Sequence, residues 1–297
     1  MKRSISFIAA LLVVAACSKP EQEPAWSKID LPTDGRMVLR DVADCGDKWW
    51  AVGGVLTGTA SGASAGPMSD GQAAPATRPA AWIGSPGSAW TEVPFAPLPA
   101  SYYGPRQVIK SVACADGRVA MVGAVPGGAH GNPRVSTWRL TTDGRMAENP
   151  APFETYGGDE AVGVGPIAAG PRGFAIAGIR SSGAAAWFSP DGRTFTLSEL
   201  DAAGTAADDV RALPDGRWLI TGTTADQQPA TWVVEDGHWA PGARPSDVRE
   251  TAVVTDGELR IAGEPADAPV RPVAVATHAD TILLAGDDSL WQATVHR

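Results

Sequence analysis

The chain has 297 residues, of which 44% are hydrophobic and 19% charged, and its formal net charge is -9. An acidic chain of this kind is a poor partner for nucleic acids and for anionic lipid headgroups, so we expect neither to bind it. The four histidines stand in unrelated contexts, and the chain has no cluster of cysteine and histidine residues. We therefore expect neither a metal site nor a cofactor.

The first 16 residues have the form of a secretory signal. Two basic residues precede an apolar run at 5–14, which is shorter than the roughly 20 residues that a membrane-spanning helix needs. The run 12–17 (LVVAAC) resembles the lipobox of bacterial lipoproteins, which implies that Cys17 carries acyl chains such as palmitate. Residues 17–25 are then a polar tether. We expect a protein that is lipid-anchored on the outer side of the bacterial cell membrane or in the outer membrane.

From residue 26 onward the chain repeats a pattern that is typical of β-propeller blades. The clearest copy, 162–199, has four runs with period-2 alternation, separated by turns rich in glycine and proline. A tryptophan marks the third strand of five copies, and in four of them a bulky residue follows it 7 or 8 positions later. These tryptophans are Trp82, Trp138, Trp187, Trp232 and Trp291. The pattern predicts an all-β chain with a single propeller of mostly four-stranded blades over 26–297.

The number of blades depends on residues 251–286. Six glycines close first hairpins, but only five tryptophans mark third strands. Either 251–263 forms a degenerate two-stranded blade, which gives six blades, or 271–275 is a third strand, which gives five; we favour six. No fourth strand follows Trp291, whereas 25–32 resembles the fourth strand at 89–94. We therefore expect the N-terminal strand to complete the C-terminal blade and to remove its open edge.

The segment Ser189 to Phe195 (SPDGRTF) resembles the Asp-box, or BNR repeat, of sialidases and related propellers. The resemblance implies a turn in which the Ser189 and Asp191 side chains bond the backbone and Gly192 has a positive φ. Sialidases also carry an arginine cluster and a Tyr/Glu nucleophile pair, and neither maps onto this chain residue by residue. The resemblance therefore implies a fold and no activity.

Cys45 and Cys114 stand at nearly equivalent positions, at the ends of the first strands of adjacent blades. An exported compartment permits a disulfide between them. The alternative is that both are small buried hydrophobic side chains that face different ways.

Two sets of residues are candidates for ligand contact. In a propeller, the loops that join second to third strands and the connections between blades emerge on the same rim. This rim carries the insertions 56–77 and 126–133, and the aromatic and histidine side chains there are candidate ligand contacts. They are Tyr102, Tyr103, Tyr156 and His130. Alternatively, these tyrosines simply occupy half-exposed rim positions.

The second set lies thirteen residues before the closing glycines of four blades and is charged in each. Because first strands line the central channel, these side chains could contact a polar ligand at its mouth, or form a hydrated wall of paired charges. They are Arg40, Lys110, Asp209 and Glu250.

Two functions fit this sequence. The first is a non-catalytic binding or scaffold propeller of the bacterial cell envelope, whose partner is an unidentified envelope protein or glycan. The alternative is a carbohydrate-active enzyme, a glycoside hydrolase or lyase, that uses rim carboxylates such as Glu154, Asp159 or Glu160. Retaining hydrolases hold two carboxyl groups about 5 Å apart. A pair of carboxyl groups in the central pocket would therefore separate the two functions.

Overall fold

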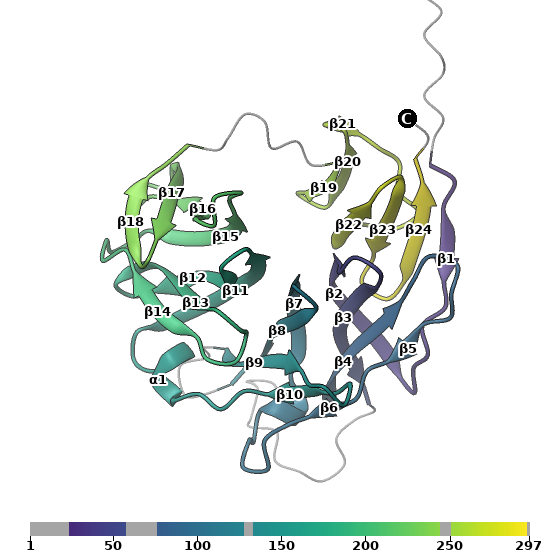
Figure 1. Ribbon diagram of the computed structural model, residues 1–297, viewed down its shortest axis with the longest axis horizontal. Helices are drawn as coiled ribbons and strands as arrows, with labels where there is room; N and C mark the ends of the chain where they lie inside the picture. The colour runs from purple at the N-terminus through teal and green to yellow at the C-terminus, as the bar shows by residue number, and fades with distance from the viewer. Residues whose placement is uncertain (1–23, 58–75, 128–132, 244–250, 296–297) are drawn as a thin grey trace, which may run out of the picture.

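The computed structural model describes residues 24–57, 76–127, 133–243 and 251–295. Six sheets stand around a central axis in the order in which the chain forms them (Figure 1). The helices in these ranges are the short η1 (Gly104–Arg106) and α1 (Phe153–Tyr156). The predicted all-β propeller is confirmed, with six blades. Cys17, His130 and Glu250 lie outside the described residues.

The first four blades each run from an inner to an outer strand with antiparallel pairing. Blade 1 contains β2 (Arg36–Asp44), β3 (Trp49–Leu56), β4 (Thr77–Gly84) and β5 (Thr91–Glu92). Blade 2 contains β7 (Val108–Ala115), β8 (Arg118–Val125), β9 (Arg134–Leu140) and β10 (Met146–Glu148), and β6 (Phe95–Ala96) pairs with β10 in parallel. Blade 3 contains β11 (Ala161–Gly170), β12 (Gly173–Arg180), β13 (Gly183–Ser189) and β14 (Thr196–Glu199). Blade 4 contains β15 (Ala206–Ala212), β16 (Trp218–Thr223), β17 (Pro229–Glu235) and β18 (His238–Pro241).

The last two blades settle the number of blades. Blade 5 contains β19 (Ala252–Thr255), β20 (Glu258–Ile261) and β21 (Glu264–Pro265). Blade 6 contains β22 (Ala274–His278), β23 (Thr281–Ala285), β24 (Leu290–Thr294) and β1 (Ser27–Ile29). Blade 5 therefore has three strands where we expected two. The five-blade alternative is wrong, because the chain at 274–278 begins the last blade rather than forming a third strand.

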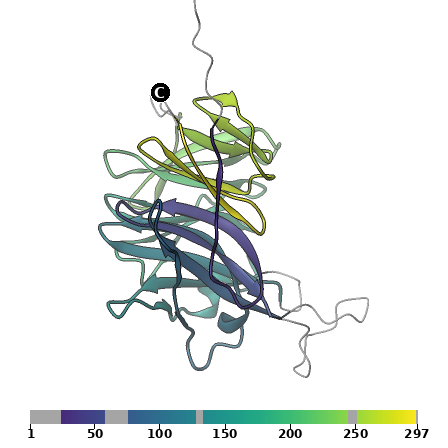
Figure 2. The same cartoon turned by 90° about the vertical axis from the view of Figure 1, so that its right-hand side faces the viewer.

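The N-terminal strand closes the ring. β1 runs antiparallel to β24, with Lys28 opposite Trp291 and Ile29 opposite Leu290 (Figures 1 and 2). Ile29 and Leu31 are buried in the hydrophobic cluster that blade 6 shares with blade 1. The predicted closure is confirmed.

In the first three blades, the tryptophan of the third strand holds the connection that enters its own blade. All five predicted tryptophans lie in third strands, and Trp82, Trp138 and Trp187 are almost fully buried. The Trp82 indole N–H donates to the Pro32 carbonyl at 2.7 Å, and that of Trp187 donates to the Thr155 carbonyl at 2.6 Å. In blade 2 the Trp138 indole donates to Gln107 Oε1 at 3.0 Å. A buried indole N–H needs a partner, and here the partner fixes a loop on the rim.

A disulfide between Cys45 and Cys114 joins blades 1 and 2, with their Cα atoms 5.5 Å apart. Cys45 directly follows β2 and Cys114 lies near the end of β7, so the bond ties the far ends of two inner strands together. The disulfide that we considered from the sequence is therefore present.

The turn after β13 is held by its own side chains. The Gly192 N–H donates to Ser189 Oγ and the Arg193 N–H donates to Asp191 Oδ1, each at 2.9 Å. Gly192 has φ +77°, a conformation that favours glycine. The Asp-box resemblance itself stays a prediction.

Candidate binding site at the channel mouth

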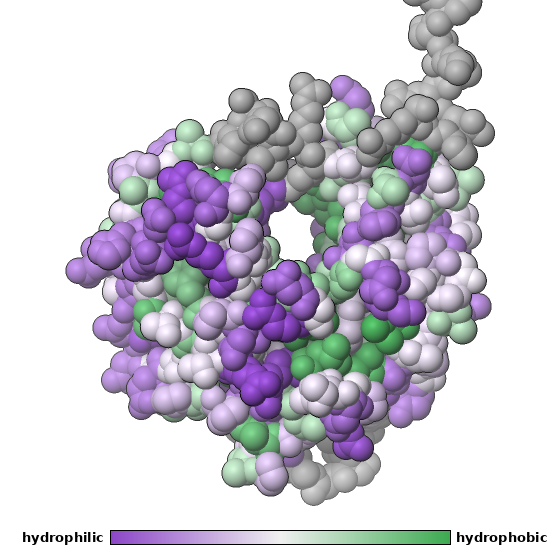
Figure 3. Space-filling view, viewed as in Figure 1, coloured by the Kyte–Doolittle hydropathy of each residue, from purple (hydrophilic) through white to green (hydrophobic). Residues whose placement is uncertain are grey.

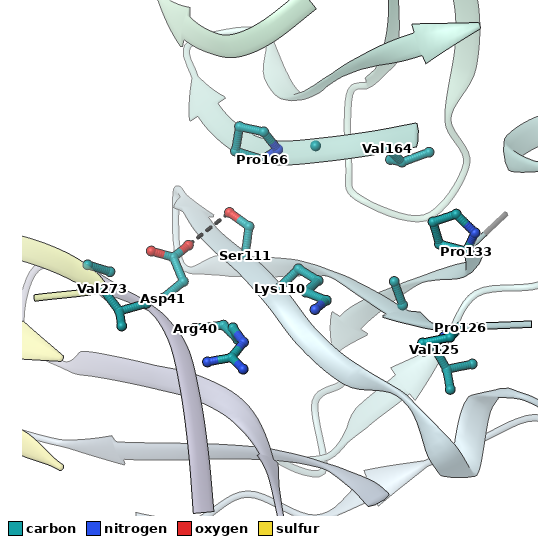
Figure 4. Close-up of a pocket in the computed structure, with 13 residues that line it drawn as sticks. Arg40, Asp41, Lys110, Ser111, Val125, Pro126, Pro133, Val164, Pro166 and Val273 are labelled. Carbon is teal, nitrogen blue, oxygen red and sulfur yellow. Dashed lines mark hydrogen bonds between the residues drawn. The ribbon is translucent and has the colours of Figure 1, made fainter. Parts of the chain in front are cut away.

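A cavity of about 540 Å³ lies where the inner strands of blades 1, 2, 3 and 6 meet at the central channel (Figure 4). Polar side chains from β2 and β7 form one wall, and Val125, Pro126, Val164 and Pro166 are among the apolar residues around them. Figure 3 shows that the ring is hollowed at its centre. The cavity belongs to this channel and opens toward the rim that carries the connections between blades.

β-Bulges at one level of the inner strands place the charged residues in this cavity. In β2 the ladder skips Arg40, since Leu39 pairs with Gly53 and Asp41 with Val52. In β7 it skips Lys110 in the same way. A bulged residue leaves the ladder and its side chain is re-aimed. Arg40 and Lys110 both line the cavity.

Lys110 carries an uncompensated positive charge in the cavity. Arg40 Nη1 lies 2.6 Å from Asp287 Oδ1, whereas Lys110 forms no ion pair within the described ranges. Burial, and secondarily repulsion by Arg40, lowers the pKa of Lys110. The part of the cavity around Lys110 is therefore positively charged, although the net charge of the chain is -9. A ligand with an anionic group would be favoured there.

Asp41 lies in the cavity wall and connects three blades. Its Oδ2 accepts hydrogen bonds from Ser111 Oγ at 2.8 Å and from the Val112 N–H at 2.9 Å, and Ser111 Oγ accepts one from the Ile167 N–H at 3.2 Å. Asp41 is half-buried, and its carboxylate accepts a further hydrogen bond from the Val42 N–H at 2.9 Å. Burial raises the pKa of Asp41 to about 6, against the lowering effect of these hydrogen bonds. Asp41 therefore exchanges a proton near neutral pH.

Asp209 does not occupy the position that corresponds to Arg40 and Lys110. The bulged residue of β15 is Asp208, between Ala207 and Asp209. Asp209 Oδ2 instead lies 3.1 Å from Arg211 Nε, and its charge contributes to the raised pKa of Asp41. Sequence reasoning missed Asp41 and Ser111. The available signal was that each directly follows a predicted channel residue.

The predicted rim tyrosines separate into two kinds. Tyr102 is 56% exposed, and its ring meets that of Tyr103 edge-on at 4.9 Å. Tyr156 is only 7% exposed and packs against Trp187 in the core, where burial raises the pKa of its hydroxyl. The structure thus corrects the expectation for Tyr156, because the turn of α1 directs its side chain inward.

The rim carboxylates considered for catalysis are not in the cavity. Glu154 belongs to α1, and Glu160 Oε2 lies 3.6 Å from Arg180 Nη2. Neither these two nor Asp159 is among the lining residues. Asp41 is the carboxylate that lines the described part of the cavity.

The described ranges contain no group of three or more His, Cys, Asp or Glu residues that could hold a metal ion. No helix in these same ranges is long and apolar enough to cross a membrane.

Fold and site together define a six-bladed propeller with a polar cavity at the mouth of its channel. Neither a protein-family model nor a curated protein sequence matches the chain. Among solved structures, Trypanosoma rangeli sialidase is similar with a TM-score of 0.52 and 11% identity, over 92% of this chain and 60% of the sialidase. XC5397 from Xanthomonas campestris, described as a gluconolactonase, has a TM-score of 0.50 and 11% identity, over 92% and 90% of the two chains.

A protein described as a glycoside hydrolase gives a TM-score of 0.46 and 12% identity, over 94% of this chain and 92% of that protein. The structural neighbours thus include sialidase-like and glycoside hydrolase propellers. At these identities the likeness shows the fold alone. The chain spans about 60% of the length of the sialidase.

Proposed function

We propose that this chain is a carbohydrate-directed propeller that binds a sugar carrying a carboxylate in the channel-mouth cavity. The observation that carries the proposal is Lys110, which has no ion pair within the described ranges and faces the like charge of Arg40. A carboxylate between the two cations would relieve their repulsion and accept charge-assisted hydrogen bonds.

The size and walls of the cavity also suit a sugar. Its volume of about 540 Å³ falls within the range of small-molecule sites. Val164 and Pro166, which lie across the cavity from Arg40 and Lys110, offer an apolar surface for the C–H face of a pyranose ring (Figure 4). The sialidase and the gluconolactonase are both named after reactions of sugars, which agrees with the proposal but does not carry it.

Hydrolysis of a bound glycoside is a second candidate. The pKa of Asp41 near 6 favours it, but the pair of carboxyl groups expected of a glycoside hydrolase is not found, since Asp41 is the only carboxylate among the residues that line the described part of the cavity. A carboxyl group with a pKa in this range is suited to general acid catalysis. Asp41 would donate its proton to the glycosidic oxygen as the bond to the anomeric carbon breaks. Water would add its hydroxyl group to that carbon, and the proton that the water loses would return to the Asp41 carboxylate. In this candidate Asp41 takes the role considered above for Glu154, Asp159 and Glu160.

Calorimetric titration with acidic and neutral sugars tests the binding proposal. Glucuronic, galacturonic and N-acetylneuraminic acid are the probes, and glucose and galactose are the neutral controls. At least one acid should bind more tightly than either neutral sugar, and Lys110→Ala should weaken it about tenfold or more. Lys110→Arg should restore part of the loss, and Lys48→Ala, at a hairpin away from the cavity, should have no effect. Equal binding of acidic and neutral sugars, or an unaffected Lys110→Ala variant, would contradict the proposal.

The methyl glycoside of the best acidic sugar separates binding from catalysis, because its poor leaving group requires a general acid. The hydrolytic candidate predicts release of methanol by the wild type and loss of release in Asp41→Asn, with binding retained. Release that continues in Asp41→Asn would exclude Asp41 as the acid. Binding without any release would leave a non-catalytic binding propeller.

We further propose that acyl chains on Cys17 anchor the protein to the membrane on the extracytoplasmic side, where a glycan or an envelope protein is its partner. The support is the lipobox-like run at 12–17, which lies outside the described residues. Cys17→Ser should move the protein from the membrane fraction to the soluble fraction. Unchanged membrane association of this variant would contradict the anchor.

A further inference from the structure

Aromatic side chains gather on the rim beside blade 2, and two of them are exposed. Tyr102 is 56% exposed and Phe153 57%; with Val162, they are the exposed large hydrophobic side chains in the described part of the chain. The connections that carry these two aromatics enter blades 2 and 3. Large apolar side chains gathered on one surface mark an interaction site more often than scattered ones do.

Two arginines lie against the rings. The guanidinium of Arg106 lies 4.2 Å from the ring centroid of Tyr102. That of Arg134 lies 5.8 Å from the ring centroid of Tyr103 and 5.0 Å from that of Phe153. Neither arginine forms an ion pair within the described ranges. We call these five residues the aromatic strip.

The strip adjoins the cavity through blade 2. Arg134 directly follows Pro133, and Gly127 directly follows Pro126; both prolines line the cavity. A Cβ added at Gly127 would lie 3.0 Å from the Tyr103 ring and 3.2 Å from Arg134 Cγ. The residue after Pro133 therefore belongs to the strip, and the residue after Pro126 lies against it.

Buried hydrogen bonds hold the strip in place. Glu148 is 5% exposed and accepts hydrogen bonds from the Leu98 N–H at 2.9 Å and from Ser101 Oγ at 2.8 Å. Ser101 Oγ in turn accepts one from the Gly104 N–H at 3.0 Å. These bonds fix the connection that carries Tyr102 and Tyr103, so a ligand on the strip does not have to order the loop.

We propose that the aromatic strip binds the sugar units that follow the acidic sugar in the cavity, so that the ligand is an acidic oligosaccharide rather than a monosaccharide. This inference rests on the proposed function. Exposed aromatic faces suit the C–H faces of sugar rings, and guanidinium groups pair with carboxylates in a bidentate manner. Arg106 and Arg134 add two positive charges to this surface, and Lys110 carries a third in the cavity. A ligand with repeated carboxylates matches these charges and the apolar faces of the rings.

A series of oligogalacturonides of one to four units tests the strip. Affinity for the wild type should rise about tenfold or more from one unit to three. The double variant Tyr102→Ala/Phe153→Ala should lose this rise and keep the affinity for the single unit. Val162→Ala, which removes exposed apolar surface without an aromatic face, should behave like the wild type. Lys110→Ala should weaken every length by a similar factor.

The series separates failure of the strip from failure of the cavity. Affinity that is independent of length, or a double variant that keeps the full rise, would overturn the strip and leave the cavity proposal intact. Binding that ignores Lys110→Ala at every length would instead overturn the cavity proposal. A rise that Val162→Ala abolishes equally would overturn the strip as a sugar site and indicate a general apolar docking surface.

Discussion

At the residue scale, Asp41 combines a structural and a chemical role. A buried carboxylate is costly unless hydrogen bonds satisfy it, and Asp41 has them from Ser111 Oγ and from the backbone N–H groups of Val42 and Val112. Two of these three donors belong to blade 2. The same contacts that satisfy Asp41 therefore join blade 1 to blade 2 at the level of the cavity.

The raised pKa of Asp41 predicts how stability depends on pH. The folded-state pKa is about 6, against an ordinary value of 3.8, so the folded protein holds this proton longer than the unfolded chain does. Protonation of Asp41 therefore contributes fully to the free energy of unfolding below about pH 4. This contribution is lost as the pH rises through 6, and the loss is at most about 3 kcal/mol. Urea unfolding of the wild type between pH 4 and 7 should show this decline.

The matched variant is Asp41→Asn, which cannot ionise at this position. Its free energy of unfolding should lack this part of the decline, whatever the substitution does to its absolute value. A pH dependence identical to that of the wild type would contradict the assignment to Asp41.

Counting thirteen residues back from the closing glycines reaches Arg40 and Lys110, the bulged residues of β2 and β7. In blade 4 the same count reaches Asp209, one residue after the bulged Asp208. Gly53 pairs with Leu39 and Gly123 with Ile109, each fourteen residues earlier, whereas Gly222 pairs with Ala207, fifteen earlier. The hairpin turn of blade 4 at 213–217 is one residue longer than that of blade 1 at 45–48. Turn length is not visible in the spacing of glycines, so Asp209 was chosen in place of Asp208.

At the scale of elements, the third-strand tryptophan shows what sequence patterns can predict. The tryptophan pattern located the third strands of five blades, and Trp82, Trp138 and Trp187 are almost fully buried in the cores of blades 1 to 3. The role of these tryptophans in holding the connections depends on backbone carbonyls and on Gln107, which no spacing reveals. β21 was missed because it has only two residues, one of them a proline, and carries no alternating pattern.

The disulfide should contribute measurably to stability. The bond closes a loop with a sequence separation of 69 residues. Loop-closure entropy for a loop of this length gives about 4 kcal/mol. We expect the double variant Cys45→Ser/Cys114→Ser to unfold at a lower urea concentration than the oxidised wild type. Reductant should lower the midpoint of the wild type and leave that of the double variant unchanged, whereas equal midpoints for the two proteins would contradict the prediction.

At the scale of the whole molecule, the ring depends on a strand that immediately follows the proposed tether. β1 supplies the outer strand of blade 6, and without it β24 would have an unpaired edge. Ile29 and Leu31 would also leave the cluster that they share with Leu39 and Leu290. Closure therefore determines both the stability of the ring and its resistance to edge-to-edge aggregation.

Deleting residues 25–31 should destabilise the protein severely, although the deleted segment is close to the chain terminus. Losing one buried aliphatic side chain costs roughly 2–5 kcal/mol. Two such losses approach a typical total stability of about 5–15 kcal/mol. Thermal unfolding should show a much lower melting temperature, and size-exclusion chromatography should show aggregation. A variant with the melting temperature and elution volume of the wild type would contradict the closure.

The central claim, that the channel mouth binds an acidic sugar, is tested most directly by a crystal structure of the protein with galacturonic acid or whichever acidic sugar binds best. We predict the sugar in the cavity between blades 1, 2, 3 and 6, with its carboxylate within hydrogen-bonding distance of Lys110 Nζ and the guanidinium of Arg40. A sugar bound at another site, or bound in the cavity with its carboxylate directed away from both cations, would contradict the account.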